Sequence, residues 1–339
     1  MATHKRRSLD HSEPATCDLW HVVKVRDRSR LYARRAALAL FLLYLAVFPG
    51  STITVALGRV PAWGAWMGSA LLLLQGAIVL CWLTGGYGRR GALVAALVFL
   101  LAWGVEHLGV TTGFPFGRYR YTDQLQPQLF GAVPLAIPCA WLMVAVGAFH
   151  FRFLILDFRL TDATSIKTLK SKIKNWVTVA IMVLLLDMQI EPVATVINRY
   201  WVWLDGGAYY GVPATNFAAW WAIGLAIAAV EGRVLGWPNS RPPPAPSTRP
   251  FPSPSRARAG NQRPPDNRHR THLLTLCVLR FTFYVIPAGL YLLNTLMFAA
   301  INLAWGNVRA GAVGLAILIV STLVALRLPI RSTRYSHPE

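Results

Sequence analysis

Long apolar runs alternate with short polar segments along most of the chain. Each run holds about 20 residues, which as a helix covers the roughly 30 Å hydrocarbon core of a bilayer. Backbone groups inside lipid must pair within their own segment, so we expect every run to be helical. The predicted fold is therefore all-α, a polytopic membrane helix bundle. Its eight transmembrane spans are expected near residues 36–57, 64–83, 92–110, 132–154, 176–197, 214–235, 273–300 and 311–328.

The composition supports a membrane protein. Hydrophobic residues make up 55% of the 339 residues and charged residues only 14%, whereas soluble domains carry about 25% charged residues. The net charge of +20 would indicate a nucleic-acid partner in a soluble protein. Here the basic residues lie between apolar runs, so nucleic acid is excluded and membrane lipids are the expected surroundings.

Lys and Arg are distributed unevenly between the two sides of the predicted bundle. With the N-terminus in the cytoplasm, 28 of the 34 fall on the cytoplasmic side and five on the other. The positive-inside rule therefore predicts a multi-pass protein integral to the plasma membrane, with both termini cytoplasmic. The expected segments are a basic cytoplasmic tail (1–35), a six-helix catalytic membrane core (36–236), a disordered Pro/Arg-rich cytoplasmic linker (237–272), two further transmembrane helices (273–330) and a cytoplasmic tail (331–339).

Several carboxyl groups fall within the spans or on the non-cytoplasmic side. Glu106 lies near the end of the third span, and Asp187 and Glu191, four residues apart in the fifth, share one helical face. Asp123 and Asp205 lie in loops at the same end of the bundle. A carboxyl group inside a membrane span is costly and usually faces the protein interior, so these acids are candidates for function.

Two loops at that end, residues 111–127 and 200–217, combine glycine, proline and aromatic side chains. This composition favours re-entrant segments that line a cavity, because irregular backbone at membrane depth must be buried in protein. An interfacial belt of aromatic residues is the alternative interpretation. Close backbone approach is expected at the loop glycines Gly113, Gly117, Gly206 and Gly207.

The sequence indicates no metal site and no cofactor site. Histidine is too sparse for the clustered ligands of a di-iron centre, and the four cysteines form no CxxC pair. Residues 86–91 match GxGxxG by letter, but no strand precedes them, so we interpret them as a turn. An alternative is that Asp187 and Glu191 hold Mg²⁺ for a prenyl diphosphate, although a second acidic pair is missing.

The chemistry that remains is protonation of an alkene in a lipid-soluble substrate. In an apolar cavity a carboxyl group tends to keep its proton until the substrate takes it. Protonation of a trisubstituted alkene gives a tertiary cation, which the faces of tyrosine and tryptophan can stabilise. A water molecule activated by a second carboxylate can then capture the cation.

Specific motifs occur in both loop regions, TGFPFGRYRY within residues 106–141 and GGAYYGVPATNF within residues 187–220. These segments resemble the signature regions of the membrane carotenoid 1,2-hydratase family, which includes γ-carotene and bisanhydrobacterioruberin hydratases. The resemblance implies addition of water across the terminal 1,2 double bond of an acyclic carotenoid end group, giving a tertiary alcohol without a cofactor. It also implies a carotenoid substrate dissolved in the membrane and, as further partners, other enzymes of carotenoid biosynthesis.

The resemblance suggests roles for the acids. On this hypothesis, Glu106 or Asp187 donates the proton to carbon 2, and Asp205 or Glu191 positions the water that attacks carbon 1. The alternative for each acid is a buried structural role, hydrogen-bonded or paired with a loop arginine. The predicted substrate-binding residues, which line the cation site or orient an acid or water, are His107, Phe116, Tyr119, Tyr121, Tyr209, Tyr210 and Asn216.

Two other functions stay open at this point. A lycopene-type cyclase begins with the same protonation, but an internal double bond captures the cation and the mass of the carotenoid does not change. A carotenoid-binding scaffold or transporter would use intramembrane acids for proton coupling and leave the pigments unaltered.

Overall fold

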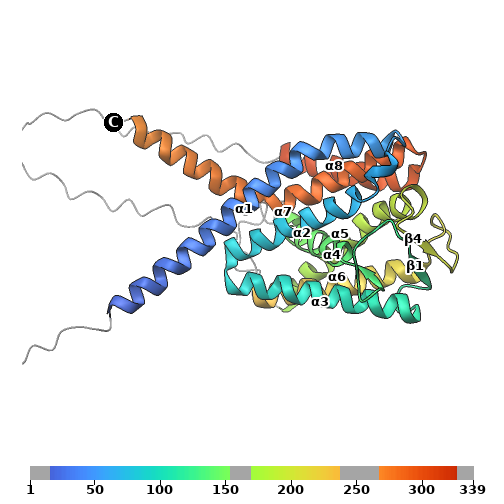
Figure 1. The fold of residues 1–339 in the computed structure, drawn as a ribbon, viewed down its shortest axis with the longest axis horizontal. Coiled ribbons are helices and arrows are strands. Elements are labelled where there is room, and N and C mark those ends of the chain that lie inside the picture. Colours follow the sequence, from blue (N-terminus) through green and yellow to red (C-terminus); the bar gives the residue numbers. More distant parts are fainter. Residues whose placement is uncertain (1–15, 153–168, 237–266, 327–339) are drawn as a thin grey trace, which may run out of the picture.

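The computed structural model describes residues 16–152, 169–236 and 267–326. Eight α-helices within these ranges form a bundle (Figure 1), which confirms the all-α, polytopic prediction. Six of them are long and apolar enough to cross a membrane, and two shorter apolar helices accompany them. The helices are α1 (Thr16–Ala56), α2 (Met67–Tyr87), α3 (Arg89–Thr112), α4 (Ala136–Arg152), α5 (Leu169–Pro192), α6 (Ala214–Val234), α7 (Asn267–Ala304) and α8 (Val308–Leu326).

Each predicted span corresponds to one helix, but α1 and α7 begin earlier than predicted. Helix α1 starts at Thr16 rather than near residue 36, because residues 16–35 contain no glycine or proline to end it. Helix α7 starts at Asn267, inside the segment expected to be a linker. Residues 237–266 and both chain ends lie outside the described residues, so the expected linker and tails stay predictions.

Helix α4 lies at the centre of the bundle. It packs against α2, α3, α5, α6 and α7, and most of its side chains are buried. Close packing is visible at Gly76 of α2, where an added Cβ would lie 2.6 Å from Cβ of Cys139. A side chain at Gly76 would therefore force α2 and α4 apart.

Short strands connect the helices at one end of the bundle, which the sequence did not predict. Strand β1 (Tyr119–Tyr121) pairs antiparallel with β4 (Trp201–Trp203), and the smaller β2 (Gln128–Leu129) pairs with β3 (Val133–Pro134). Strands β1 and β4 come from the two loops that share the Gly, Pro and aromatic composition. Their pairing satisfies backbone groups that would otherwise be buried without partners.

Two short helical turns complete the description. A 3-10 turn (Ala62–Gly64) precedes α2, and a five-residue π-helical turn (Val193–Ile197) continues α5 beyond Pro192. Turns of the π type are rare and occur frequently at functional sites. This one leads directly into β4, and so it joins the acidic face of α5 to the loop region.

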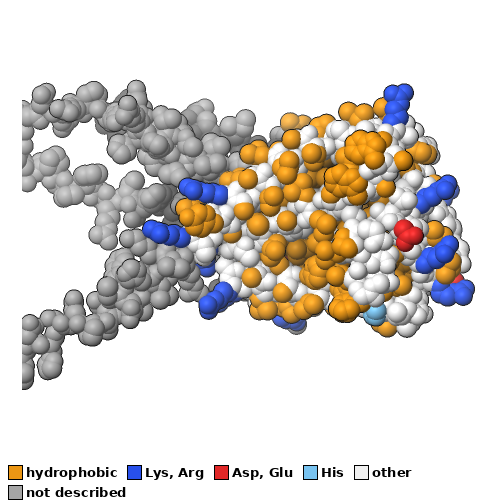
Figure 2. Space-filling view, in the orientation of Figure 1, with side chains coloured by type: hydrophobic (Ala, Val, Ile, Leu, Met, Phe, Trp, Pro, Cys, Tyr) orange, Lys and Arg blue, Asp and Glu red, His pale blue; other side chains and the backbone are white. Residues whose placement is uncertain are grey.

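The surface is that of a membrane protein. In Figure 2, hydrophobic side chains cover the middle of the bundle, whereas Lys and Arg lie towards its two ends. Large exposed aromatic residues are found in the connections at the β1–β4 end, where such side chains suit a membrane interface. They include Trp63, Trp66, Phe114 and Phe130.

Candidate functional site

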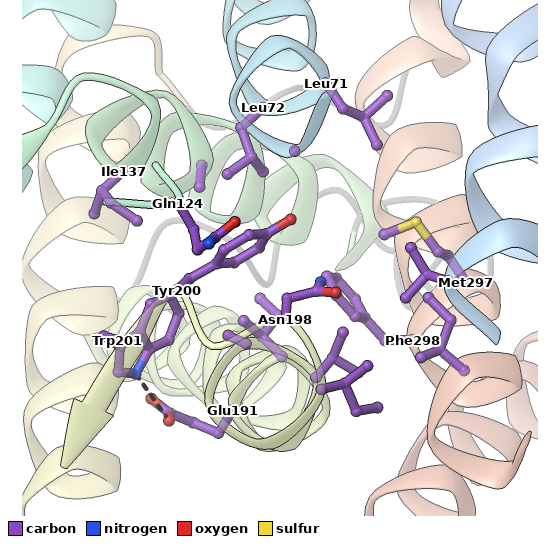
Figure 3. Close-up of a pocket in the computed structure, with 18 of the residues that line it drawn as sticks. Leu71, Leu72, Gln124, Ile137, Glu191, Asn198, Tyr200, Trp201, Met297 and Phe298 are labelled. Atoms are coloured by element: carbon purple, nitrogen blue, oxygen red, sulfur yellow. Dashed lines mark hydrogen bonds between the residues drawn. The ribbon is translucent and has the colours of Figure 1, made fainter. Parts of the chain in front are cut away.

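A cavity of about 560 Å³ opens inside the bundle near the β1–β4 end. Its walls come from α1 to α7 and from both paired strands, and most of its lining side chains are apolar. Figure 3 shows Glu191 and Trp201 on one side of this space and Met297 and Phe298 of α7 on another. The cavity therefore combines a hydrocarbon-like interior with at least one carboxyl group in its wall.

Glu106 of α3 is buried and fully engaged by aromatic donors. Its Oε2 accepts hydrogen bonds from the hydroxyls of Tyr119, at 2.6 Å, and Tyr121, at 2.7 Å. Its Oε1 accepts one from the indole N–H of Trp141 on α4, at 2.8 Å. Because alternate residues of a strand point to the same face, β1 presents both tyrosines to this acid.

A second acidic group forms on α5 and α6. The amide Nδ2 of Asn216 lies 3.2 Å from Oδ2 of Asp187 and 3.1 Å from Oε1 of Glu191, so one amide group donates to both acids. Oε2 of Glu191 accepts from the indoles of Trp203, at 2.9 Å, and Trp201, at 3.3 Å. Asp187 is fully buried but does not border the cavity, and its Oδ1 has no partner among the described residues.

The strand pair connects the two acidic groups. The register places Tyr119 opposite Trp203 and Tyr121 opposite Trp201. The ring centroids of these pairs lie 5.1 and 6.1 Å apart. The donors to the acid of α3 therefore pack directly against the donors to the acid of α5. A single two-stranded platform positions both carboxyl groups.

The three acids Glu106, Asp187 and Glu191 are not arginine-paired within the described residues. None of Glu106, Asp187 and Glu191 forms a salt bridge with a basic residue in the described part of the chain. Their hydrogen-bond donors are tyrosine, tryptophan and asparagine side chains. The structure therefore does not support a structural ion pair with a loop arginine for any of these three acids.

Asp205 lies elsewhere. Its carboxylate forms an exposed salt bridge with Arg118, at 2.8 Å, and accepts the backbone N–H of Arg118 at 2.7 Å. These hydrogen bonds and the guanidinium charge lower the pKa of Asp205 below its ordinary value. The residue does not border the cavity, because it follows β4 at the edge of the strand pair. Its expected role in positioning water is therefore not supported by its location.

The predicted substrate-binding residues divide into two sets. His107 stacks on Trp103 with ring centroids 5.3 Å apart, and the hydroxyl of Tyr209 donates to the carbonyl of Met188. Neither they nor Tyr210 borders the cavity, so the structure does not bring these three side chains to the cavity, and their contact with substrate stays a prediction. The four that do border it are Phe116, Tyr119, Tyr121 and Asn216.

Several cavity residues were not anticipated from the sequence. Trp141 stacks on Trp220 with centroids 3.7 Å apart and an interplanar angle of 12°, which holds its indole N–H towards Glu106. Trp141 lies within the motif-bearing segment, and so its indole could have been proposed as a donor. The residues of α7, such as Asn294 and Met297, gave no comparable signal, because they lie far along the chain in an ordinary apolar span.

Polar side chains also border the cavity near the loops. Gln124 is exposed, and Asn198 and Tyr200 are partly buried beside it (Figure 3). Burial raises the pKa of Tyr200 to about 12, so its hydroxyl stays neutral near pH 7. The cavity therefore has a polar margin towards solvent at the loops, and its other walls are mostly apolar, with buried acids and amides at a few positions.

Fold and site together define a polytopic membrane protein with an acid-lined, aromatic cavity. The chain belongs to the carotenoid biosynthesis protein family, whose model matches residues 67–249. This range contains α2 to α6 and the acids Glu106, Asp187 and Glu191. The resemblance noted in the motif segments is thereby confirmed at the level of the family.

A named relative is more specific. The bisanhydrobacterioruberin hydratase of Haloarcula japonica is 32% identical to this chain over 132 residues, which are 39% of this chain. The match covers 41% of the relative, less than half its length. No solved structure is similar to this chain.

Proposed function

We propose that the protein is a carotenoid hydratase that adds water across the terminal 1,2 double bond of an acyclic carotenoid end group. The family is one of carotenoid biosynthesis, and the named relative is a hydratase. The single observation that carries the proposal is the placement of two carboxyl groups, Glu106 and Glu191, in the wall of one apolar cavity. Such a cavity suits a hydrocarbon substrate and an acid–base reaction.

The proposed reaction has two steps that balance without any further reactant. A carboxyl group transfers its proton to carbon 2, and the π electrons form the new C–H bond, leaving a tertiary cation at carbon 1. Faces of the surrounding tyrosine and tryptophan rings stabilise such a cation by about 0.5–2 kcal/mol each. The oxygen of water then bonds to carbon 1, and its released proton passes to a carboxylate.

Hydrogen-bond partners favour Glu106 as the acid and Glu191 as the base. The groups around Glu191 are indole N–H and amide NH₂ groups, which donate only, so this position favours an acceptor such as a carboxylate. Two partners of Glu106 are tyrosine hydroxyls, which can donate or accept. Glu106 can therefore keep hydrogen-bonded partners in both its protonated and its ionised form.

The membrane setting completes the proposal. The carotenoid reaches the cavity from the bilayer, and water enters at the polar margin beside Gln124 and Asn198. The distribution of Lys and Arg favours a plasma-membrane protein with both termini cytoplasmic. In this orientation the site lies in the non-cytoplasmic leaflet, where other enzymes of carotenoid biosynthesis exchange substrates through the lipid.

Expression in cells that accumulate an acyclic carotenoid tests this function. We expect pigments heavier by the mass of one water for each reacted end, with a tertiary hydroxyl group. Cells that express Glu106→Gln at equal protein levels should retain the parent carotenoid. A product of unchanged mass but altered retention would indicate cyclisation, and unaltered pigment would indicate binding or transport. Either result would refute the proposed hydratase.

A further inference from the structure

Two buried amides meet on another wall of the cavity. Nδ2 of Asn294 on α7 donates to Oε1 of Gln75 on α2, at 3.1 Å, and to the carbonyl of Leu290, at 2.8 Å. Both side chains are fully buried and both border the cavity. Among the described residues, Nε2 of Gln75 and Oδ1 of Asn294 have no hydrogen-bond partner. One donor and one acceptor are thus left over at the same place.

Apolar side chains lead from the loop end of the bundle to this amide pair. The start of α2 and the end of α7 lie at the same end, since the indole of Trp305 donates to the carbonyl of Val55, just before the α1–α2 connection. Each helix lines the cavity with four residues at i, i+3, i+4 and i+7 spacing, which form a stripe along one helical face. The residue of each stripe farthest from the loop end carries an amide side chain. The stripes are Gly68, Leu71, Leu72 and Gln75 on α2, and Ile301, Phe298, Met297 and Asn294 on α7.

The stripes define an apolar trough with a polar floor. Seven residues of helix rise about 10 Å, so the amides lie about that distance below the first residues of each stripe. Figure 3 shows Leu71 and Leu72 of α2 and Met297 and Phe298 of α7 around the same space. A ligand that fills this trough must be hydrocarbon along its length and polar only at its tip.

The free atoms specify which polar group. A hydroxyl group can accept from Nε2 of Gln75 and donate to Oδ1 of Asn294, whereas a carbonyl group can only accept and an alkene can do neither. We propose that Gln75 and Asn294 form a hydroxyl-binding subsite for an apolar alcohol. The choice of a hydrated carotenoid end as its natural ligand rests on the proposed function.

The subsite shares its cavity with the acid of α3. Sδ of Met143 on α4 lies 3.6 Å from Nδ2 of Asn294. Two residues earlier on the same helix, Trp141 donates to Glu106. Because Glu106, Gln75 and Asn294 border one cavity, an end group hydrated there can reach the amides without leaving it, and they then bind its new hydroxyl group. The subsite would favour the alcohol over the alkene from which it forms.

A matched pair of small ligands tests the subsite without requiring turnover. Dihydromyrcene carries a trisubstituted terminal alkene, and dihydromyrcenol is its tertiary alcohol, the product of adding water to that alkene. We expect the purified, detergent-solubilised wild-type protein to bind dihydromyrcenol about tenfold more tightly by calorimetry, the contribution of two modest hydrogen bonds. Equal affinities for the two ligands in the wild-type protein would overturn the proposal, whether or not a water molecule occupies the amides.

Substitutions at the two amides then test whether they cause the preference for the alcohol over the alkene. Gln75→Met together with Asn294→Leu should bring the affinity ratio to about one, and a ratio that stays near ten in this double variant would refute the assignment. Thr295→Val is the matched control, because its buried hydroxyl donates to the carbonyl of Tyr291 and does not border the cavity. The wild-type comparison decides the question even if the double variant does not fold.

The outcome is separable from that of the proposed function. Selective binding of the alcohol by a protein that hydrates no carotenoid would support the hydroxyl-binding subsite and refute the proposed hydratase. Hydration of a carotenoid by a protein that binds both small ligands equally would refute only the hydroxyl-binding subsite.

Discussion

The hydroxyl of Tyr119 lies 2.6 Å from Oε2 of Glu106, the shortest of the three contacts that this carboxyl group makes. In the proposed mechanism this hydroxyl holds the acid in position through both protonation states. Removing a hydrogen bond to a charged or ionisable group costs about 1.5–3 kcal/mol.

Tyr119→Phe should therefore lower the rate of carotenoid hydration by about tenfold to a hundredfold. The matched control is Tyr87→Phe. The hydroxyl that it removes lies beside His150 and does not border the cavity. The measurement is the initial rate of alcohol formation in membranes with equal protein content. Equal losses in both variants would show that the effect is a general loss of folded protein.

The shared amide of Asn216 makes a second prediction. Asn216→Leu removes the donor that lies between Asp187 and Glu191 and leaves two buried carboxyl groups without it. We expect the unfolding free energy in detergent to fall by about 1–3 kcal/mol. In an Asp187→Asn background the same substitution should cost less, because only one carboxyl group then depends on the amide donor. Strict additivity of the two changes would contradict the proposed coupling.

The salt bridge between Asp205 and Arg118 gives a pH-dependent prediction. The folded pKa of Asp205 lies below the value of about 3.9 expected for an unfolded chain. Its stabilising contribution is therefore complete above about pH 4 and is lost as the pH falls through the lower, folded pKa. The difference in Tm between wild type and Asp205→Asn should be constant at neutral pH and should shrink in acid.

Asp205→Asn also tests the location of the site. Because the carboxylate is partly exposed and lies outside the cavity, the rate of hydration should change by less than about twofold. A loss as large as that of an acid in the cavity wall would return Asp205 to the group of catalytic candidates.

Two neighbouring glycines provide a matched pair for the loop geometry. An added Cβ at Gly207 would overlap the carbonyl oxygen of Val212, whereas at Gly206 it would meet nothing within 4 Å. Gly207→Ala should therefore cost at least about 2 kcal/mol of unfolding free energy through overpacking. Gly206→Ala should stay within about 0.5 kcal/mol of wild type. Similar values for both substitutions would contradict the close approach of these loop segments.

Much of the fold could be predicted because hydrocarbon imposes a simple rule on the chain. A helix must stay apolar for about 20 residues to cross it, and this pattern is visible in every predicted span. Helix ends are less constrained outside the membrane, where a run without glycine or proline can continue as helix. This is why α1 and α7 begin earlier than the apolar pattern predicts.

The site was only partly predictable, because it depends on contacts between distant segments. The i, i+4 spacing placed Asp187 and Glu191 on one face, and Asn216 joins them as part of one group. No local pattern indicates that β1 and β4, of three residues each, pair across the loops. Without that pairing, Asp205 could not be distinguished from the buried acids by its position in the sequence.

The most direct test of the central claim is hydration of an acyclic carotenoid by the purified protein in water enriched in heavy oxygen and deuterium. The account predicts an alcohol that carries one heavy oxygen at carbon 1 and one non-exchangeable deuterium at carbon 2. It also predicts that Glu106→Gln lowers the yield at least about a hundredfold, the usual contribution of a general acid. A product without heavy oxygen, or a Glu106→Gln variant as active as wild type, would contradict it.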